Sequence, residues 1–349
     1  MSSLLVGDMA PPFVLPSDSG SDFDIYADTV AGQYVAIVFC PDGIAEATEQ
    51  LAEFARQHES LRQNGILVVA VSKEPASVLA KRREQLTLPF HLLSDQENKL
   101  FVSYGVAADG GGQAVTLVVR PNQHVFSVIH DGLHAAEVLN RVSAQKDLQA
   151  EISFGFQPPI LMVPDVLTAD DCQWLIGAFT DEDLPVVSTR EFVGMRARGE
   201  INGEIKVEAS DYGRVDRTDM YIVSDRLRSR ISQRFQTRLL PEIKKAFHYP
   251  VSRYEGLSIS RYEGERGGEA HGHRDNSMPE VAERRFAVSI NLNAEEFEGG
   301  GVRFTEFSKQ VYRAPTGGAL VFSCSLFHEA MAITKGHRFV LLTFLLGNQ

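Results

Sequence analysis

Tyr34-Val-Ala-Ile-Val-Phe-Cys40 is an unbroken apolar run in the first half of the chain. A strand of a parallel sheet has this composition when helices cover both of its faces, because neither face meets water. A second such run, Ile66–Ser72, follows a segment whose apolar residues have helical spacing. Asn64-Gly65 closes that segment, and glycine supplies the left-handed residue with which many helices end. The alternation of strand and helix predicts an α/β layered fold.

The rest of the first 150 residues continues this alternation. The sequence pattern predicts a helix near 75–85, a short strand at Phe90–Leu93, a hairpin of Val115–Arg120 with Val125–Ile129, and a last helix near 135–148. We therefore expect a first domain over residues 1–150.

This part of the chain resembles the peroxiredoxin branch of the thioredoxin fold. The matching stretches are Val6-Gly-Asp-Met-Ala-Pro-Pro-Phe-Val-Leu15, Val38-Phe-Cys-Pro41, Phe90-His-Leu-Leu-Ser-Asp95 and Tyr104-Gly-Val106. The resemblance implies a thioredoxin-like α/β domain. It also implies a homodimer formed through this domain, because peroxiredoxin-like domains often self-associate.

The residues that carry peroxidase chemistry in that family do not match. The family pattern places the peroxidatic cysteine seven residues after Pro41, where this chain has Thr48. A threonine hydroxyl has no accessible anion at neutral pH and cannot attack a peroxide as a thiolate does. Gln113 and Ala114 stand where the activating arginine of the family is expected. The resemblance thus implies a peroxiredoxin-like domain that lacks its catalytic cysteine.

Cys40 keeps a thiol function open. It ends an apolar run with no basic neighbour, which favours a buried and unreactive thiol. The other cysteines, Cys172 and Cys324, complete no CxxC or zinc-like spacing. Two functions therefore remain open for this part of the chain: a thiol-based redox enzyme that uses Cys40, and a non-catalytic interaction protein whose first domain docks or dimerises.

Helix signals stop between Leu148 and Pro159, and we expect a second domain over residues 157–349. Thr168 and Asp171 predict a helix start, because Thr168 can cap the helix and Asp171, three residues on, lies in the first turn, where acidic residues are favoured. A long helix is predicted after Ser224, with an interruption at Pro241. Beyond residue 256 strands and turns dominate.

The clearest strand of the second domain is Arg285–Asn293. One of its faces is apolar and the other is small and polar, and a barrel interior that holds a polar ligand needs such a polar face. The apolar face carries Phe286, Val288, Ile290 and Leu292, and the polar face Ala287, Ser289, Asn291 and Asn293. Many short strands predict an all-β jelly roll with supporting helices.

His273-Arg-Asp275, His328 and Arg338 carry the chemistry of this domain. Two imidazoles and one carboxylate can bind one face of a ferrous ion and leave the opposite face open. Side chains two apart in a strand project to the same side, so His273 and Asp275 can bind one ion. An arginine can grip a carboxylate through two parallel hydrogen bonds. The pattern indicates an iron oxygenase whose co-substrate is a carboxylic acid.

The second domain is similar to the 2-oxoglutarate- and iron(II)-dependent dioxygenases, within the prolyl 4-hydroxylase-like group. The matching residues are Arg261-Tyr262, His273-Arg-Asp275, Glu298-Gly-Gly300 with Phe304, Pro315 with Gly318, His328 and Gly336-His-Arg338. The resemblance implies a double-stranded β-helix, or jelly roll, that uses Fe(II), 2-oxoglutarate and O2. Ascorbate is a further candidate cofactor.

The resemblance also implies a role for each site residue. The implied iron ligands are His273, Asp275 and His328. Arg338 would hold the far carboxylate of 2-oxoglutarate, and Tyr262 and Asn291 would line the co-substrate pocket. We interpret His271 as exposed or as lying behind the ligands, because only three protein groups fit on one face of the metal.

The implied reaction converts 2-oxoglutarate and O2 to succinate and CO2 while it hydroxylates an unactivated C–H bond. The substrate would be a prolyl or other protein side chain, or a small molecule, since a fold does not name its substrate. Residues 190–217 form a long polar segment for which we expect a substrate lid. The lid residues that are candidates for contact with an acidic substrate are Arg196, Arg198, Arg214 and Arg217.

Composition narrows the partners and the compartment. A formal charge of −12 disfavours nucleic acid, whose phosphates an acidic chain repels. No apolar run approaches the roughly 18 residues of a membrane span, so we expect no membrane partner. Residues 1–13 lack the charged and apolar regions of a signal peptide. The chain also has few cysteines, which fits a reducing compartment, so we expect a cytoplasmic protein.

Overall fold

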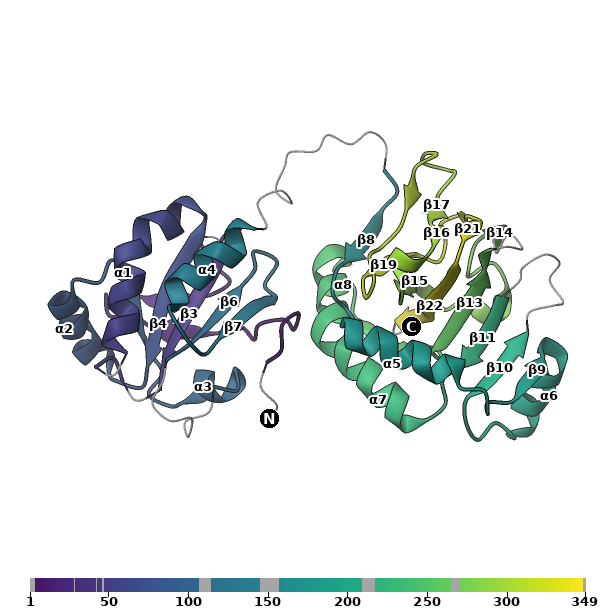
Figure 1. Cartoon of the computed structure of the whole chain (residues 1–349), viewed down its shortest axis with the longest axis horizontal. Coiled ribbons are helices and arrows are strands. Elements are labelled where there is room, and N and C mark those ends of the chain that lie inside the picture. Colours follow the sequence, from purple (N-terminus) through teal and green to yellow (C-terminus); the bar gives the residue numbers. More distant parts are fainter. Residues whose placement is uncertain are drawn as a thin grey trace. The chain divides into compact units, whose positions relative to one another are not determined.

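The computed structural model describes residues 4–27, 29–41, 43–45, 47–106, 114–144, 157–208, 217–264 and 270–347, without the side chains of Ala270 and His271. The chain divides into two compact units, Met1–Ile152 and Ser153–Gln349 (Figure 1). The predicted boundary region, Leu148–Pro159, falls largely outside the described residues.

The first unit is built on a five-stranded sheet. Its strand order is β5 (His91–Ser94), β4 (Ile66–Ser72), β3 (Tyr34–Cys40), β6 (Val115–Val119) and β7 (Val125–Ile129). The first three strands are parallel, while β6 and β7 are antiparallel to their neighbours. All seven residues of β3 are buried, as the apolar run predicted. The predicted hairpin is β6–β7.

Helices cover both faces of this sheet. They are α1 (Thr48–Gln63), α2 (Ala76–Leu86), α3 (Lys99–Ser103) and α4 (His134–Ser143). Leu51 and Phe54 of α1 pack with Val138 of α4 on one face, and Phe101 of α3 packs on the other. A small hairpin of β1 (Val14–Pro16) and β2 (Asp22–Asp24) precedes the sheet. The predicted thioredoxin-like α/β fold is confirmed.

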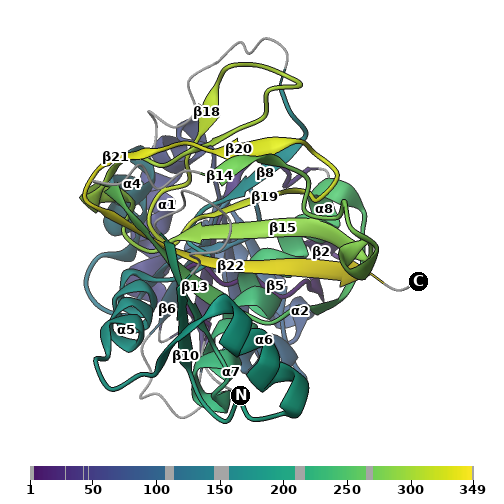
Figure 2. The same ribbon diagram turned by 90° about the vertical axis from the view of Figure 1, so that its right-hand side faces the viewer.

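The second unit is mostly sheet. Its larger sheet has nine strands, in the order β8 (Ile160–Val163), β19 (Ala319–Ser323), β15 (Arg284–Asn291), β22 (His337–Gly347), β13 (Ser258–Glu263), β11 (Arg217–Tyr221), β10 (Ile205–Glu208) and β9 (Val186–Ser188), with β12 (Val251–Tyr254) also paired to β22. The smaller sheet contains β14 (Ala270–His273), β20 (His328–Ala330), β17 (Val302–Arg303) and β18 (Val311–Tyr312). A further pair joins β16 (Glu298–Gly299) and β21 (Ile333–Lys335). In the view of Figure 2, β14 and β20 lie above β15 and β22, and the two pairs belong to different sheets.

The two faces of β15 meet different surroundings. Its apolar residues, among them Phe286, Val288 and Ile290, lie in the main core with α5 (Ala169–Thr180), α7 (Asp225–Arg234) and α8 (Leu240–Phe247). Figure 1 shows α5 and α7 lying across this face of the sheet. Helices therefore close one face, and the small polar residues of β15 are left to the other. This sheet-rich arrangement is consistent with the predicted jelly roll.

The helix ends follow their local sequence. The predicted cap of α5 is confirmed: the Thr168 hydroxyl accepts from the Asp171 N–H, and the Asp171 carboxylate accepts from the Thr168 N–H. The helix predicted after Ser224 is interrupted next to Pro241. A π-helical turn, Phe235–Leu239, separates α7 from α8, and Pro241 is the second residue of α8. Proline has no N–H to donate to the preceding turn, and such a site favours a local change of helix type.

Among the described residues, no helix combines the length and apolar character that a membrane crossing requires.

Candidate metal centre

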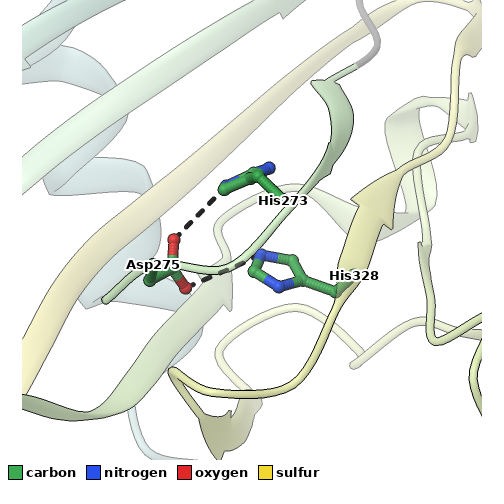
Figure 3. A group of neighbouring side chains, drawn as sticks. All are labelled: His273, Asp275 and His328. Carbon is green, nitrogen blue, oxygen red and sulfur yellow. Dashed lines mark ion pairs between the residues drawn. The ribbon is translucent and has the colours of Figure 1, made fainter. Parts of the chain in front are cut away.

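His273, Asp275 and His328 converge at one point of the second unit (Figure 3). His273 Nε2 lies 3.3 Å from Asp275 Oδ1, and His328 Nε2 lies 3.6 Å from Asp275 Oδ2. One potential ligand atom from each residue falls within 4.8 Å of the others. Within the described ranges this is the one group of three or more such side chains that could hold a metal ion.

Strand pairing brings the two histidines together although 54 positions separate them. β14 and β20 are antiparallel, and His273 is directly opposite His328 in their register. Opposed residues of an antiparallel pair have neighbouring side chains, and these imidazole rings are 4.5 Å apart between centroids.

Asp275 is held differently from the prediction. The expected strand does not reach it, because β14 ends at His273. Asp275 lies in the following turn, where its backbone N–H donates to the Cys324 carbonyl at 3.0 Å. Arg284 donates to the Asp275 carbonyl at 3.2 Å. These two bonds hold the turn so that the carboxylate faces both imidazoles.

The environment of His328 suits a metal ligand. Its side chain is buried, against the Phe322 ring at 4.6 Å between centroids. Burial lowers the pKa of His328, while the Asp275 carboxylate and the Leu326 carbonyl act in the opposite direction. The neutral imidazole is the form that binds metals. With Nδ1 3.0 Å from the Leu326 carbonyl as donor, Nε2 keeps its lone pair toward the site.

Arg338 is a buried cation without an acidic partner in the described part of the chain. Its side chain is only 5% exposed. Nε donates to Asn291 Oδ1 at 2.9 Å, and Nη2 donates to Ser289 Oγ at 3.2 Å. Burial lowers the pKa of Arg338, and Tyr262 acts in the opposite direction. A buried charge is expensive unless it is paired, so this guanidinium fits an anionic ligand in the cavity.

A network of hydrogen bonds surrounds Tyr262, which is opposite Arg338 in the register of β13 and β22. The Arg338 guanidinium carbon lies 5.6 Å from the centre of the Tyr262 ring. Arg217 donates to the Tyr262 hydroxyl at 3.2 Å and to both oxygens of Asp219 at 2.8 and 2.6 Å. Ser260 also donates to Asp219. Sequence reasoning missed Asp219 and Ser260, although Arg217-x-Asp219 in an extended segment is a signal for such a pair.

Asn291 lies behind Arg338. It is 3% exposed, accepts from Arg338, and donates to the Ala314 carbonyl at 2.7 Å. It is not among the residues that line the cavity, whereas Tyr262 and Ser289 are. The amide therefore orients the guanidinium from the protein side.

One cavity of about 1250 Å³ joins these residues. The three potential metal ligands, Arg338 and Tyr262 all line it. Small-molecule pockets commonly measure about 300–1000 Å³. This cavity therefore has room for a second molecule beside a small dicarboxylate.

The four arginines of the expected lid have different surroundings. Arg196 and Arg217 line the cavity. Arg198 does not, and it pairs with Glu200 on the surface at 2.7 Å. Arg214 lies outside the described residues, as does the side chain of His271. The segment contains a helix, α6 (Thr189–Arg198), and β10, which pack together through Phe192, Ile205 and Val207.

The first unit holds Thr48 where its relatives' cysteine was expected. Thr48 begins α1, and its hydroxyl donates to the Ala45 carbonyl at 2.8 Å. Glu74 accepts from the Ile44 N–H at 3.0 Å and from the Ser72 hydroxyl at 3.2 Å. Ala114 is buried where the arginine was expected, and Gln113 lies outside the described residues.

Cys40 is a protonated thiol at neutral pH. It is 1% exposed at the end of β3. Burial, with a contribution from the charge of Glu74, raises the pKa of Cys40 to about 12. Cys172 and Cys324 are also buried and free. Since the thiolate is the reactive form, the geometry of Cys40 does not favour the thiol alternative.

Comparison with known proteins divides the chain in the same way. Residues 6–128 match the model of the AhpC/TSA family, and residues 257–346 match that of the 2OG-Fe(II) oxygenase superfamily.

The relatives of the first unit are peroxiredoxins. The bcp peroxiredoxin of Coxiella burnetii is 32% identical over 153 residues, which are 40% of this chain and 99% of that protein. Peroxiredoxin Bcp of Escherichia coli K12 is 29% identical over 152 residues, 40% of this chain and 96% of that protein. Among solved structures, peroxidoxin BcpB from Mycobacterium tuberculosis has 22% identity and a TM-score of 0.37, covering 40% of this chain and 97% of that chain.

Proposed function

We propose that this chain, which belongs to the peroxiredoxin (AhpC/TSA) family through residues 6–128 and carries a 2OG-Fe(II) oxygenase domain over residues 257–346, acts as a hydroxylase at His273, Asp275 and His328. Iron(II) bound there would supply the oxidation that couples conversion of 2-oxoglutarate and O2 to succinate and CO2 with hydroxylation of a C–H bond. The substrate would be a protein side chain, such as a prolyl residue, or a small molecule.

The observation that carries the proposal is the placement of Arg338. A buried guanidinium with no carboxylate partner among the described residues lines the same cavity as the two histidines and the aspartate. The cation would bind the far carboxylate of 2-oxoglutarate through its planar fork of donors. Asn291 and Ser289 would fix the orientation of that fork before the co-substrate arrives.

The protein's own groups would prepare the rest of the site. His328 is kept neutral by burial, with one nitrogen committed to the Leu326 carbonyl. Asp275 would add one negative charge beside two neutral imidazoles. These ligands would leave one positive charge of a ferrous ion unbalanced, so the ion could also bind an anionic co-substrate. The apolar wall at Phe322 and Phe304 limits water around His328.

The test replaces one ligand and measures metal and co-substrate separately. In His273→Ala we expect loss of Fe(II) binding in anaerobic calorimetry and loss of succinate formation with Fe(II), ascorbate and 2-oxoglutarate. The matched control is His337→Ala, which removes an exposed histidine paired with Glu263. Succinate formation at the wild-type rate in His273→Ala would reject the proposal.

A further inference from the structure

The charged residues of the cavity are unevenly neutralised. Its lining holds five arginines: Arg196, Arg217, Arg274, Arg284 and Arg338. Three of them form ion pairs within the protein. These pairs are Arg217–Asp219 at 2.6 Å, Arg274–Glu306 at 2.6 Å and Arg284–Glu255 at 2.7 Å. Arg338 is reserved for the co-substrate in the proposed function, which leaves Arg196.

The exposed guanidinium of Arg196 has no ion pair or hydrogen bond with any described residue. It lies on α6, four positions after Phe192, and residues with this spacing share one face of a helix. Phe192 also lines the cavity. Arg198 on the same helix points elsewhere and is neutralised by Glu200. Arg196 therefore lines the cavity and, unlike Arg198, has no carboxylate partner among the residues that the structure describes.

Tyr221 adds a second free donor at the same place. Its ring stacks on Phe192 with centroids 4.3 Å apart and planes 20° apart. Its hydroxyl makes no hydrogen bond within the described ranges, although the residue lines the cavity. The stacked pair gives a flat apolar wall, and the phenol places a polar hydrogen at its edge.

The charges near this phenol have a positive excess. Burial raises the pKa of Tyr221 and Asp219 raises it further, while Arg217, Arg196 and Arg284 act in the opposite direction. Asp219 is already bound by Arg217, and Glu255 binds Arg284. An anion brought to this corner would therefore meet the Arg196 cation, which no group in the described ranges neutralises.

We propose that Arg196 and the Tyr221 hydroxyl form a carboxylate-binding subsite for the oxygenase substrate, an inference that rests on the proposed function. The guanidinium and the phenol offer donors to the two oxygens of one carboxylate. The Phe192–Tyr221 pair would contact the apolar part of the same molecule. The substrate class is therefore a carboxylic acid, either a free acid or an acidic side chain in a peptide.

Glu280 is the remaining charged residue of the lining that has no ion pair with a described residue. It is exposed and lies on the short turn Pro279–Val281, away from α6 in the sequence. A cationic substrate would depend on Glu280, and an anionic substrate would depend on Arg196. The two residues therefore make opposed variants for one experiment.

Binding is measured on the full chain with zinc(II) in place of iron and saturating 2-oxoglutarate, so that no turnover occurs. The probes come in acid and amide pairs. N-acetyl-L-amino acids and their amides test a main-chain carboxylate, and N-acetyl-aspartate amide and N-acetyl-asparagine amide test a side-chain carboxylate. We expect at least one acid to bind at least tenfold more tightly than its amide. Arg196→Gln should reduce this preference about 10-fold to 100-fold, the range for hydrogen bonds to charged groups. Tyr221→Phe should reduce it a few-fold, and Arg198→Gln should leave it unchanged.

The measurements distinguish failure of the Arg196 subsite from failure of the proposed oxygenase function. Preference for a main-chain carboxylate supports a free acid, and preference for a side-chain carboxylate supports an acidic peptide. Equal binding of acids and amides, or an undiminished preference in Arg196→Gln, overturns the subsite. So does a loss of probe binding in Glu280→Gln but not in Arg196→Gln. Wild-type protein that neither binds 2-oxoglutarate nor forms succinate with iron would instead reject the proposed function.

Discussion

Arg338 is a buried cation, and its burial bears directly on the proposed binding of 2-oxoglutarate. Its guanidinium is desolvated, orientated by Asn291 and Ser289, and without a carboxylate among the described residues. Such a group destabilises the empty protein and stabilises a complex with a dianion, because the ligand supplies the missing charge. Its energetic effect is therefore expected to depend on whether the ligand is present.

Arg338→Gln tests this directly. We expect KM for 2-oxoglutarate to rise about 10-fold to 100-fold, the range for a charge-assisted hydrogen-bonded pair, with a smaller effect on kcat. In thermal unfolding, 2-oxoglutarate should raise the Tm of the wild type and not that of the variant. Arg303→Gln is the control, since Arg303 pairs with Glu329 at 2.7 Å and does not line the cavity. An unchanged KM in Arg338→Gln would contradict the assignment.

Asp171 is a second buried charge, but it is fully paired. Arg230 and Arg234 donate to its two oxygens at 2.5 and 2.8 Å, and the Thr168 N–H donates as well. Burial alone would raise the pKa of Asp171, and these bonds outweigh it, so that the folded pKa lies below the ordinary value of 3.8. The carboxylate thus joins the start of α5 to α7.

The sign of the pH dependence follows from that lowered pKa. The unfolded chain takes up the proton first, so the stabilisation is complete above about pH 5 and declines as pH falls through 3.8 and below. Asp171→Asn should destabilise by about 3 kcal/mol at pH 7, because two arginines lose their partner. Urea denaturation between pH 3 and pH 7 should show the difference from wild type shrinking toward acid. A difference that is constant with pH would contradict the argument.

At the scale of elements, the pairing of β14 with β20 sets the metal centre. His273 and His328 meet only because these two strands are in register. Gly272 lies between His271 and His273 in β14, and a Cβ there would overlap the Phe327 ring. The Phe327 ring packs closely against the backbone at Gly272, and this contact helps to set the position of β14 relative to β20.

Gly272→Ala should weaken metal binding without removing any ligand. The added methyl group must displace either Phe327 or the strand, and a displaced strand separates His273 from His328. We expect Fe(II) affinity to fall about tenfold, as for other disturbed supports of a metal ligand. Combining it with Phe327→Leu, which makes room, should recover most of the affinity. A double variant as weak as Gly272→Ala would show that steric overlap is not the cause.

Local elements of this fold follow from sequence because their cause is local. The apolar run of β3, the alternating faces of β15 and the Thr168–Asp171 cap each depend on neighbouring residues, and each is present as predicted. The end of β14 before Asp275 and the register of β14 on β20 depend on chain segments far apart. Sequence spacing does not determine such pairings, because a one-residue slip gives an equally regular strand.

The same distinction applies to the candidate site. His273, Asp275, His328 and Arg338 were predicted from residue types whose chemistry is specific, and the structure brings them to one cavity. The contact of Arg217 with Asp219 and Tyr262 was not predicted, since it joins β11 to β13 across a sheet whose strand order the sequence does not state. The sequence also did not show which of Arg196 and Arg198 lines the cavity. The position of each on α6 in the structure determines this.

At the scale of the whole molecule, the chain joins a peroxiredoxin-family unit without the expected cysteine to an oxygenase-family unit with a complete set of candidate ligands. Residues 1–150 and 157–349 are proposed as the two domains, and a homodimer through the first is a further proposal. Cys40 is the cysteine of the first unit, and burial raises the pKa of its thiol, so it is not suited to peroxide reduction. Its role would then be structural or in recognition.

Thr48→Cys in the full chain asks whether one substitution would restore a peroxidase. The start of α1 favours a thiolate, because the free N–H groups of a helix lower a thiol's pKa. Two features oppose it. The Glu74 carboxylate already occupies the Ile44 N–H close to Thr48, and Ala114 supplies no cation where an activating arginine was expected. We expect the new cysteine to react with hydrogen peroxide at a rate within about tenfold of that of a free thiol, as measured by trapping of the sulfenic acid and mass spectrometry.

Adding Ala114→Arg and Glu74→Gln should accelerate the reaction at least a further tenfold, whereas Thr48→Ser should remain inert. Rapid peroxide reduction by Thr48→Cys alone would show that this unit retains a complete peroxidase environment and that only the nucleophile is missing.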